Sequence, residues 1–176
     1  DPDLRTDRVR LRRWSLEDLP CVEAAATDPD IPTGTTVPEV FTEPEGRAFI
    51  ERQWSRNADG RALALAVAAP PDGVAVGQVY LALTGGPREC RLGYWMIPSA
   101  RRKGIATEAI RIASRWVLED TDVYRLVAEV HPDNVASRTL LEGLGFTEEG
   151  VLRSWLWIRG EVHDAIQYSL VRSDLA

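Results

Sequence analysis

Short apolar runs alternate with stretches of helical spacing over most of the chain, and this alternation limits the protein to a mixed fold of strands and helices. Six runs have the length and the flanking turn residues that predict strands: 62–68, 74–83, 90–96, 124–131, 151–158 and 165–171. Turns are predicted at 70–73 and 85–87. Helical spacing predicts one helix that begins near Gly104 and another over 134–144, which Gly145 should end in a left-handed conformation.

The first 60 residues contain two helix-start patterns. Ser15 and Thr42 are each followed three residues later by an acidic residue, the arrangement in which side chains cap the first helical turn. A strand over 9–14 precedes the first helix, which we expect to end near Ala26. The segment 28–42, which contains three prolines and a glycine, predicts a loop. The complete order favours an α/β or α+β sandwich with mixed strand pairing.

The composition is that of an ordinary globular protein, with 44% hydrophobic and 27% charged residues. A chain of 176 residues can bury a core without disulfides or a structural metal, so we expect one domain over 1–176. Two cysteines, Cys21 and Cys90, and two histidines, His131 and His163, stand in no metal-type or redox-type spacing. We therefore expect no metal site and a reducing compartment.

The charge balance and the short apolar runs exclude other kinds of partner. The net charge of −6 disfavours nucleic acid, because phosphate binding needs a positive field, and it suits a cationic substrate such as an amine better. The longest apolar run, 62–69, is too short to span a bilayer, and the first residues show no secretory pattern. We expect a cytoplasmic protein with no nucleic-acid or membrane partner.

The segment between the strand 90–96 and the following helix has the features of an anion-binding turn. Three basic residues, Arg101, Arg102 and Lys103, come directly before Gly104. Backbone N–H groups at the start of a helix have no partners inside it, and the helix dipole adds positive potential there. Gly104 and Ala106 keep side chains away, so that phosphate oxygens can approach the backbone. An ordinary turn with solvated basic residues is the alternative interpretation.

A second set of motifs decides between these interpretations. They are Leu92-Gly93-Tyr94-Trp95, Arg101-x-x-Gly104-x-Ala106, Asn134-x-x-Ser137, Leu144-Gly145-Phe146 and Glu149-Gly150-Val151-Leu152-Arg153. In this order and spacing, and with the opening strand Leu4-x-Thr6-x-Arg8-Val9-x-Leu11-Arg12, the whole chain resembles the GNAT acetyltransferases, and more narrowly their ribosomal-protein N-terminal (RimJ/RimL-like) branch. The resemblance implies a GNAT-like α/β (α+β) fold with a mixed, mostly antiparallel central sheet of about seven strands, splayed in the middle and flanked by about four helices.

The resemblance also implies where acetyl-coenzyme A binds, as a co-substrate and without a metal. The pantetheine arm would lie against the end of the strand 90–96, where backbone groups of Met96 and Ile97, followed by Pro98, would pair with it. The turn after it would hold the pyrophosphate through Arg101, Arg102, Lys103, Gly104, Ile105, Ala106 and Thr107. Asn134 would reach the coenzyme from the next helix, although an asparagine there also suits a helix cap.

In this family the acetyl group passes directly to an amine, which requires a proton acceptor for the amine and a proton donor for the leaving thiolate. The resemblance implies that Ser137 is the donor. Glu129 and His131 share one face of the strand 124–131 and are both candidates for the base, as is Glu89. Glu129 also suits an ion-paired strand residue, and the sequence leaves the base open.

Two departures from the family pattern widen the functional interpretation. Arg91 replaces a carboxylate often found before the Gly-Tyr-Trp motif, and Leu141 replaces a tyrosine that many members use as the acid. The leading hypothesis is an N-acetyltransferase for a primary amine at a protein or peptide N-terminus. A small amine or an aminoglycoside is an alternative acceptor, and an acyl-CoA sensor without efficient turnover is an alternative of another class. Homodimers are common in this branch and are expected among the partners.

Overall fold

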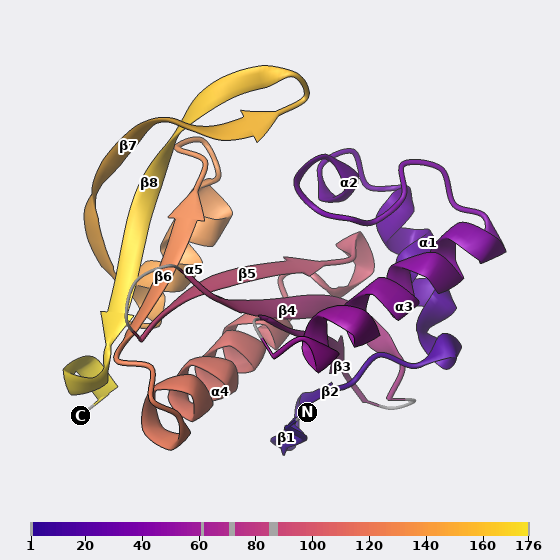
Figure 1. The fold of residues 1–176 in the computed structure, drawn as a ribbon, viewed down its shortest axis with the longest axis horizontal. Coiled ribbons are helices and arrows are strands. Elements are labelled where there is room, and N and C mark those ends of the chain that lie inside the picture. Colours follow the sequence, from indigo (N-terminus) through magenta and orange to yellow (C-terminus); the bar gives the residue numbers. More distant parts are fainter. Residues whose placement is uncertain (1, 61, 71–72, 85–87, 176) are drawn as a thin grey trace. The chain divides into compact units, whose positions relative to one another are not determined.

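The structure is a computed structural model that describes residues 2–60, 62–70, 73–84 and 88–175 (Figure 1). It forms two compact units: Asp1–Ala82 with Gly93–Ala113, and Leu83–Leu92 with Ser114–Ala176. The turn predicted at 85–87 and the centre of the turn predicted at 70–73 lie outside the described residues. The prediction of a single domain over 1–176 stays a prediction.

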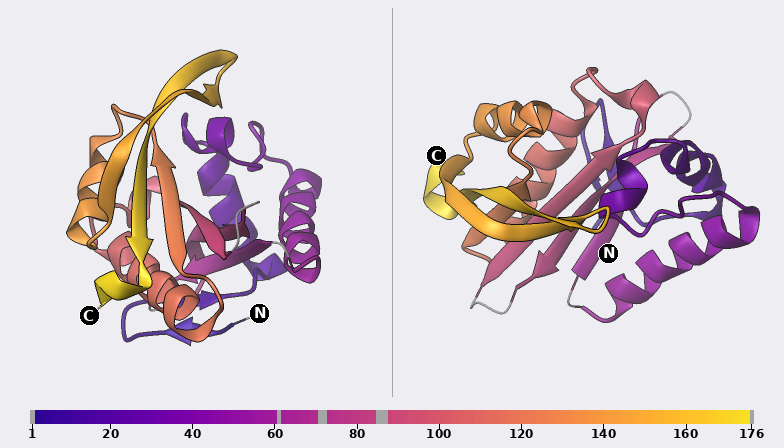
Figure 2. Two further views of the ribbon diagram at one scale, coloured as in Figure 1. Left: turned by 60° about the vertical axis from the view of Figure 1, so that its left-hand side comes forward. Right: turned by 90° about the horizontal axis from the view of Figure 1, so that it is seen from above.

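The first unit contains a run of antiparallel strands. They are β1 (Leu4–Arg5), β2 (Arg10–Arg12), β3 (Ala62–Ala68) and β4 (Ala75–Leu83), which pair in that order. Three helices follow β2 in the chain, α1 (Leu19–Ala26), α2 (Ile31–Gly34) and α3 (Glu43–Ala58), and they gather on one side of these strands (Figure 2). The second half of β5 (Glu89–Met96) and the start of α4 (Ile105–Asp120) complete this unit.

Both predicted helix starts are confirmed. The Ser15 N–H donates to Asp18 Oδ2 at 2.8 Å, while Ser15 Oγ accepts from the Glu17 N–H at 3.3 Å. A 3₁₀ turn, Leu16–Asp18, therefore leads into α1, which ends at Ala26 as expected. Thr42 Oγ1 accepts from the Glu45 N–H at 3.3 Å and caps α3.

The loop predicted over 28–42 contains the one-turn helix α2, so that prediction is wrong at its centre. Asp28 Oδ1 accepts hydrogen bonds from the N–H groups of Asp30 (2.9 Å) and Ile31 (3.0 Å), which fixes the start of the turn. Ile31, 5% exposed, then packs into the core of the first unit. Four residues are too few to show helical periodicity in the sequence.

Three aromatic side chains form the centre of the core in the first unit. Trp14 lies 5.3 Å from Phe49 and 6.1 Å from Trp95 between ring centroids, and all three are buried. Gly77 on β4 lies beside the end of β5, and a Cβ atom there would stand 2.3 Å from the Trp95 carbonyl oxygen. Only glycine permits this close approach of the two strands.

The second unit consists of the first residues of β5 with β6 (Arg125–Val130), β8 (Glu161–Val171) and β7 (Thr147–Ile158), which pair in that order. β5 and β6 are parallel, and the other pairs are antiparallel. The β5–β6 register covers only Glu89–Arg91 against Arg125–Val127, a short ladder of the kind expected for a splayed pair.

The helix α5 (Val135–Gly143) lies on one face of this part of the sheet, where the Tyr168 hydroxyl of β8 accepts from Arg138 Nε and donates to the Glu142 carboxylate. Gly145 ends the helix with φ +87°, and the Phe146 N–H reaches back to the Leu141 carbonyl oxygen at 3.0 Å. This is the predicted helix ending.

The predicted fold class is confirmed as mixed and mostly antiparallel. Among the described residues we count eight strands and five α-helices, one more of each than expected. The additional strand is the two-residue β1, and the additional helix is α2. No helix in the described ranges has both the length and the apolar character needed to cross a membrane.

Candidate active site

The basic turn, which we define as residues 101–104, joins the end of β5 to α4 in the first unit. After a 3₁₀ turn at Pro98–Ala100, the chain reaches Arg102 with φ +59° and Gly104 with φ +75°. Arg102 and Gly104 stand two positions apart, with Lys103 between them. Turns with left-handed residues direct successive N–H groups toward one side and form anion-binding nests. Every residue of the basic turn is exposed, and Ile105, Ala106 and Thr107 form the first turn of α4.

Arg8 contacts this turn but was not among the site residues predicted from the sequence. Its Nη2 donates to the Lys103 carbonyl oxygen at 2.7 Å. A Cβ atom at Gly104 would lie 3.2 to 3.6 Å from the Arg8 guanidinium, so the charge stands directly beside the glycine. The two residues are 95 positions apart, and only the folded chain reveals the contact.

Arg101, the first residue of the basic turn, contacts two other groups of the protein. Its Nη2 pairs with Asp28 Oδ2 at 2.7 Å, and its Nε donates to the Met96 carbonyl oxygen at 3.0 Å. Burial alone would raise the pKa of Asp28, but two backbone N–H groups and the Arg101 guanidinium together hold that pKa below its ordinary value. Arg101 therefore braces the end of β5 against the start of α2.

Several backbone groups predicted to bind the pantetheine arm already have partners in the protein. The Ile97 N–H donates to the Val76 carbonyl oxygen at 3.0 Å, and the Ile97 carbonyl oxygen accepts from the Ala100 N–H at 3.0 Å. The Met96 carbonyl oxygen accepts from Arg101. A carbonyl oxygen has two lone pairs and can accept a second hydrogen bond, whereas the Ile97 N–H is fully used. Pro98 is exposed.

In the second unit, Asn134 and Ser137 form the start of α5. Asn134 Oδ1 accepts from the Ser137 N–H at 3.1 Å, so Asn134 is the N-cap of this helix. The cap holds the backbone of Ser137 in place at the first helical turn, and Ser137 itself is half-buried. The helix-cap interpretation of Asn134 is thus confirmed, and its contact with a coenzyme stays a prediction.

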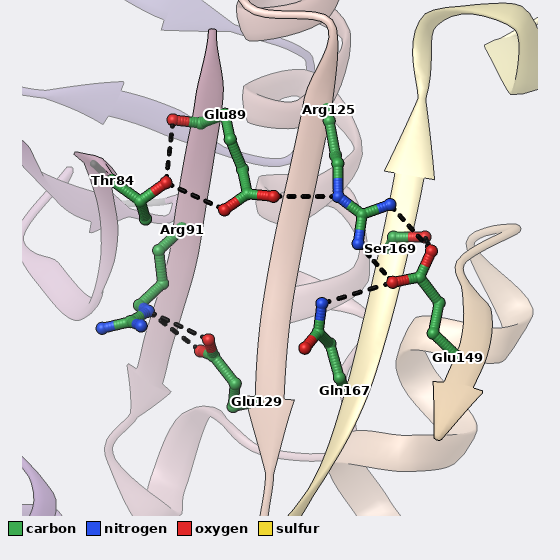
Figure 3. A network of polar contacts seen from close by, with 8 residues as sticks. All are labelled: Thr84, Glu89, Arg91, Arg125, Glu129, Glu149, Gln167 and Ser169. Carbon is green, nitrogen blue, oxygen red and sulfur yellow. Dashed lines mark hydrogen bonds and ion pairs between the residues drawn. The ribbon is translucent and has the colours of Figure 1, made fainter. Parts of the chain in front are cut away.

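Glu129, one of the candidate bases, is ion-paired with Arg91. Both carboxylate oxygens lie near Arg91 Nε, Oε1 at 3.2 Å and Oε2 at 3.0 Å, and 9% of the Glu129 side chain is exposed (Figure 3). To accept a proton, this carboxylate would have to give up its ion pair. The structure therefore confirms the interpretation of Glu129 as an ion-paired strand residue.

The same sheet face carries a larger cluster, which we call the carboxylate–arginine network: Thr84, Glu89, Arg125, Glu149, Gln167 and Ser169 (Figure 3). Arg125 Nε donates to Glu89 at 2.9 Å, and its terminal nitrogens bond to both oxygens of Glu149. Arg125, with further help from Ser169 and Gln167, lowers the pKa of Glu149 to about 2 against the opposing effect of burial. Glu89, the third candidate base, is therefore also held in an ion pair.

His131 and His163 form a close pair at one end of the second unit. His131 Nε2 lies 3.3 Å from His163 Nδ1, and the Asp133 N–H donates to His131 Nδ1 at 3.2 Å. In the neutral pair, this donation assigns the His131 proton to Nε2, which then donates to His163. Glu161 lies at the outer nitrogen of His163, with Oε2 3.9 Å from Nε2.

The remaining metal-type and nucleophilic residues form no further site in the described ranges. Cys21 and Cys90 are both buried, and burial raises the pKa of the Cys21 thiol. Three or more possible metal ligands nowhere gather within these ranges. A candidate covalent carrier would need an accessible thiolate, which buried thiols do not supply.

Comparisons with known proteins indicate one family and one fold. A family model described as an acetyltransferase (GNAT) domain matches residues 8–147. YoaA of Bacillus subtilis, an uncharacterized N-acetyltransferase, is 26% identical over 172 residues, which are 97% of each chain. The ribosomal protein uS5-alanine N-acetyltransferase of Escherichia coli is 33% identical over 85 residues, 48% of this chain and 44% of that enzyme. The structure of Mycobacterium smegmatis RimJ in complex with CoA-disulfide has a TM-score of 0.83 at 24% identity, covering 95% of this chain and 83% of that one.

Proposed function

The chain belongs to the GNAT acetyltransferase family, and on that premise we propose that it transfers the acetyl group of acetyl-coenzyme A directly to a primary amine. The observation that carries the proposal is the exposed basic turn, with Arg102 and Gly104 in left-handed conformations directly before a helix of 16 residues. Such a turn offers unpaired N–H groups to a diphosphate. Gly104 suits the coenzyme because a side chain there would occupy the space beside Arg8.

The proposed roles at the coenzyme follow from these contacts. N–H groups of the turn and of Ile105, Ala106 and Thr107 bind the pyrophosphate, and the charges of Arg8, Arg102 and Lys103 support them. Bound acetyl-coenzyme A supplies the thioester carbonyl carbon that the amine attacks. A backbone N–H near Met96, other than the Ile97 N–H that is bonded to Val76, donates to the carbonyl oxygen as negative charge grows on it.

Of the three candidate bases, we assign the amine's proton to His131. Glu129 and Glu89 would both have to break an ion pair with an arginine to accept it. His131 Nδ1 accepts from the Asp133 N–H at 3.2 Å and lies 4.0 Å from Asp133 Oδ2, a carboxylate that would stabilise the imidazolium, and its Nε2 is held 3.3 Å from His163 Nδ1. The proton leaves the amine nitrogen for His131 Nδ1, directly or through a water. Ser137 gives its hydroxyl proton to the thiolate as the carbon–sulfur bond breaks and takes a proton from solvent water in its place.

A protein or peptide N-terminus is the acceptor class that the relatives support best, since the uS5-alanine N-acetyltransferase matches about half of the chain. The branch resemblance also supports a cytoplasmic location and a homodimer. Light scattering would measure the molar mass and so test the homodimer. Small amines and aminoglycosides belong in the same acceptor panel as the peptides.

Two measurements test the proposal. Calorimetry with coenzyme A measures binding at the turn, and release of the free thiol from acetyl-coenzyme A measures transfer to each acceptor. We expect binding together with thiol release that depends on an amine. Tight binding without release for any acceptor would instead identify an acyl-CoA sensor, and absence of binding would contradict the proposal.

The assignment of Ser137 is tested by replacing it with alanine. We expect kcat to fall about 100-fold while coenzyme affinity is unchanged, because only the proton donor is lost. Thr139→Ala, an exposed change in the same helix, is the matched control. A normal kcat for Ser137→Ala would place the donor elsewhere.

A further inference from the structure

The contact between Arg91 and Glu129 carries an inference about the acceptor. Glu129 is more than nine-tenths buried, while 45% of the Arg91 side chain is exposed. Glu129 contacts Arg91 through Nε, and Figure 3 shows a terminal nitrogen of the guanidinium pointing away from this carboxylate. Within the part of the chain that the structure describes, Arg91 Nη1 and Nη2 have no hydrogen-bond partner.

Glu129 holds the Arg91 guanidinium at Nε, so the two terminal nitrogens are available to a second anion. The guanidinium donors form a planar fork, and the edge that carries the two terminal nitrogens matches both oxygens of one carboxylate. Because Glu129 already restricts the Arg91 side chain, less conformational entropy is lost when a ligand binds. The pair therefore has the form of a preorganised carboxylate receptor whose anchor is buried.

The charges around the pair define the ligand more closely. Arg91 and Glu129 lie on the sheet face opposite α5, together with Glu89, Arg125 and Glu149 (Figure 3). Among these five side chains the three carboxylates outnumber the two arginines. A simple anion is disfavoured by that balance, whereas a ligand with both an ammonium and a carboxylate group suits it.

We propose that Arg91, positioned by Glu129, binds a carboxylate of the acceptor, so that the acceptor carries an acidic group close to its reacting amine. An amino acid and an N-terminal peptide with an acidic side chain share this chemistry. The inference rests on the proposed function, names the substrate class of that same site, and makes Glu129 a positioning residue.

Matched pairs of acceptors test the proposal and distinguish the two sources. One pair is an α-amino acid and its amide, and the other is a peptide with Asp or Asn as its second residue. We expect the carboxylate member of one pair to have a kcat/KM about 10- to 100-fold higher, mainly through a lower KM. Arg91→Gln should abolish this ratio. Glu129→Gln, which keeps an oxygen for Arg91 Nε, should retain part of the ratio, and Glu129→Ala should lose it.

Arg115→Gln removes an exposed, ion-paired arginine from α4 and serves as the matched control, for which the ratio should not change. Equal kcat/KM values within both pairs, or a ratio that survives Arg91→Gln, would overturn the inference. A second measurement does not need turnover: an N-acetyl amino acid should bind the wild-type protein more tightly than its amide does, and Arg91→Gln should remove the difference. Equal binding overturns the inference, whereas a failure of coenzyme binding overturns the proposed function.

Discussion

The basic turn and the carboxylate–arginine network both gather charge, but they are built in different ways. The basic turn depends on backbone conformation over four residues, with left-handed Arg102 and Gly104 before α4. The network depends on side chains from four strands: Arg125 on β6 connects Glu89 on β5 with Glu149 on β7, and Glu149 also accepts from Gln167 and Ser169 on β8 (Figure 3). The comparison teaches that one region is suited to hold a ligand, whereas the other holds the sheet of the second unit together.

Gly104→Val, in the basic turn, should have the largest effect on coenzyme affinity. The β-branched side chain disfavours the left-handed backbone and would contact Arg8, so coenzyme affinity should fall about 30-fold in calorimetry. Gly60→Val is the matched control, because Gly60 has φ +68° with nothing within 4 Å of a Cβ. Equal losses of affinity in the two variants would mean that backbone strain alone explains the result.

Arg8→Gln sharpens the comparison by removing a charge while keeping the turn. We expect coenzyme affinity to fall about 10-fold, because one charge-assisted contact to phosphate is lost. The salt dependence of the affinity should decrease as well. Arg10→Gln removes an exposed arginine of the same segment that pairs with Asp3, and its affinity should match the wild type. An effect of Arg10→Gln as large as that of Arg8→Gln would contradict the assignment.

Arg101→Gln tests whether the first residue of the basic turn acts as a brace. The variant loses the contacts to Asp28 and to the Met96 carbonyl oxygen, so the free energy of unfolding should fall by about 1 kcal/mol in urea titrations. Its loss of coenzyme affinity should be smaller than that of Arg8→Gln. The reverse order would show that Arg101 binds the ligand.

Glu149→Gln acts on the second region and should have the smallest effect. The pKa of Glu149 is lowered to about 2 from its ordinary value of 4.5, so its ionised form stabilises the folded state fully above pH 4.5. This contribution is lost as the pH falls from 4.5 toward 2. Because Glu149 is partly exposed, we expect less than about 1 kcal/mol at neutral pH.

The pH dependence gives the sharper test of that residue. Unfolding titrations between pH 5 and 2 should show a weaker loss of stability for Glu149→Gln than for the wild type, with coenzyme affinity unchanged at pH 7. An identical pH dependence for the two proteins would contradict the role of the network.

Features that lie within a few residues of one another could be predicted from the sequence. The caps at Ser15 and Thr42 and the left-handed Gly145 are local, because each depends on one turn of chain. The position of the basic turn is local for the same reason. The short helix α2 was missed because Asp28 hydrogen bonds, and not periodicity, fix its start.

The partners of the candidate site residues could not be predicted, because they come from distant parts of the chain. Arg8 meets Lys103 across 95 positions, and Arg101 meets Asp28 across 73. Arg91 and Glu129 are brought together by the parallel register of β5 and β6, which no local pattern specifies. The sequence therefore located the turn but did not show which basic residue is already neutralised.

The central claim is that N–H groups of residues 102–107 bind the pyrophosphate of acetyl-coenzyme A. Titration of ¹⁵N-labelled protein with coenzyme A, followed through the amide signals, tests it most directly. We predict that the amides of 102–107 shift most strongly and saturate together, and that those of the control segment around Gly60 remain in place. Binding that leaves the amides of 102–107 unchanged would contradict the account.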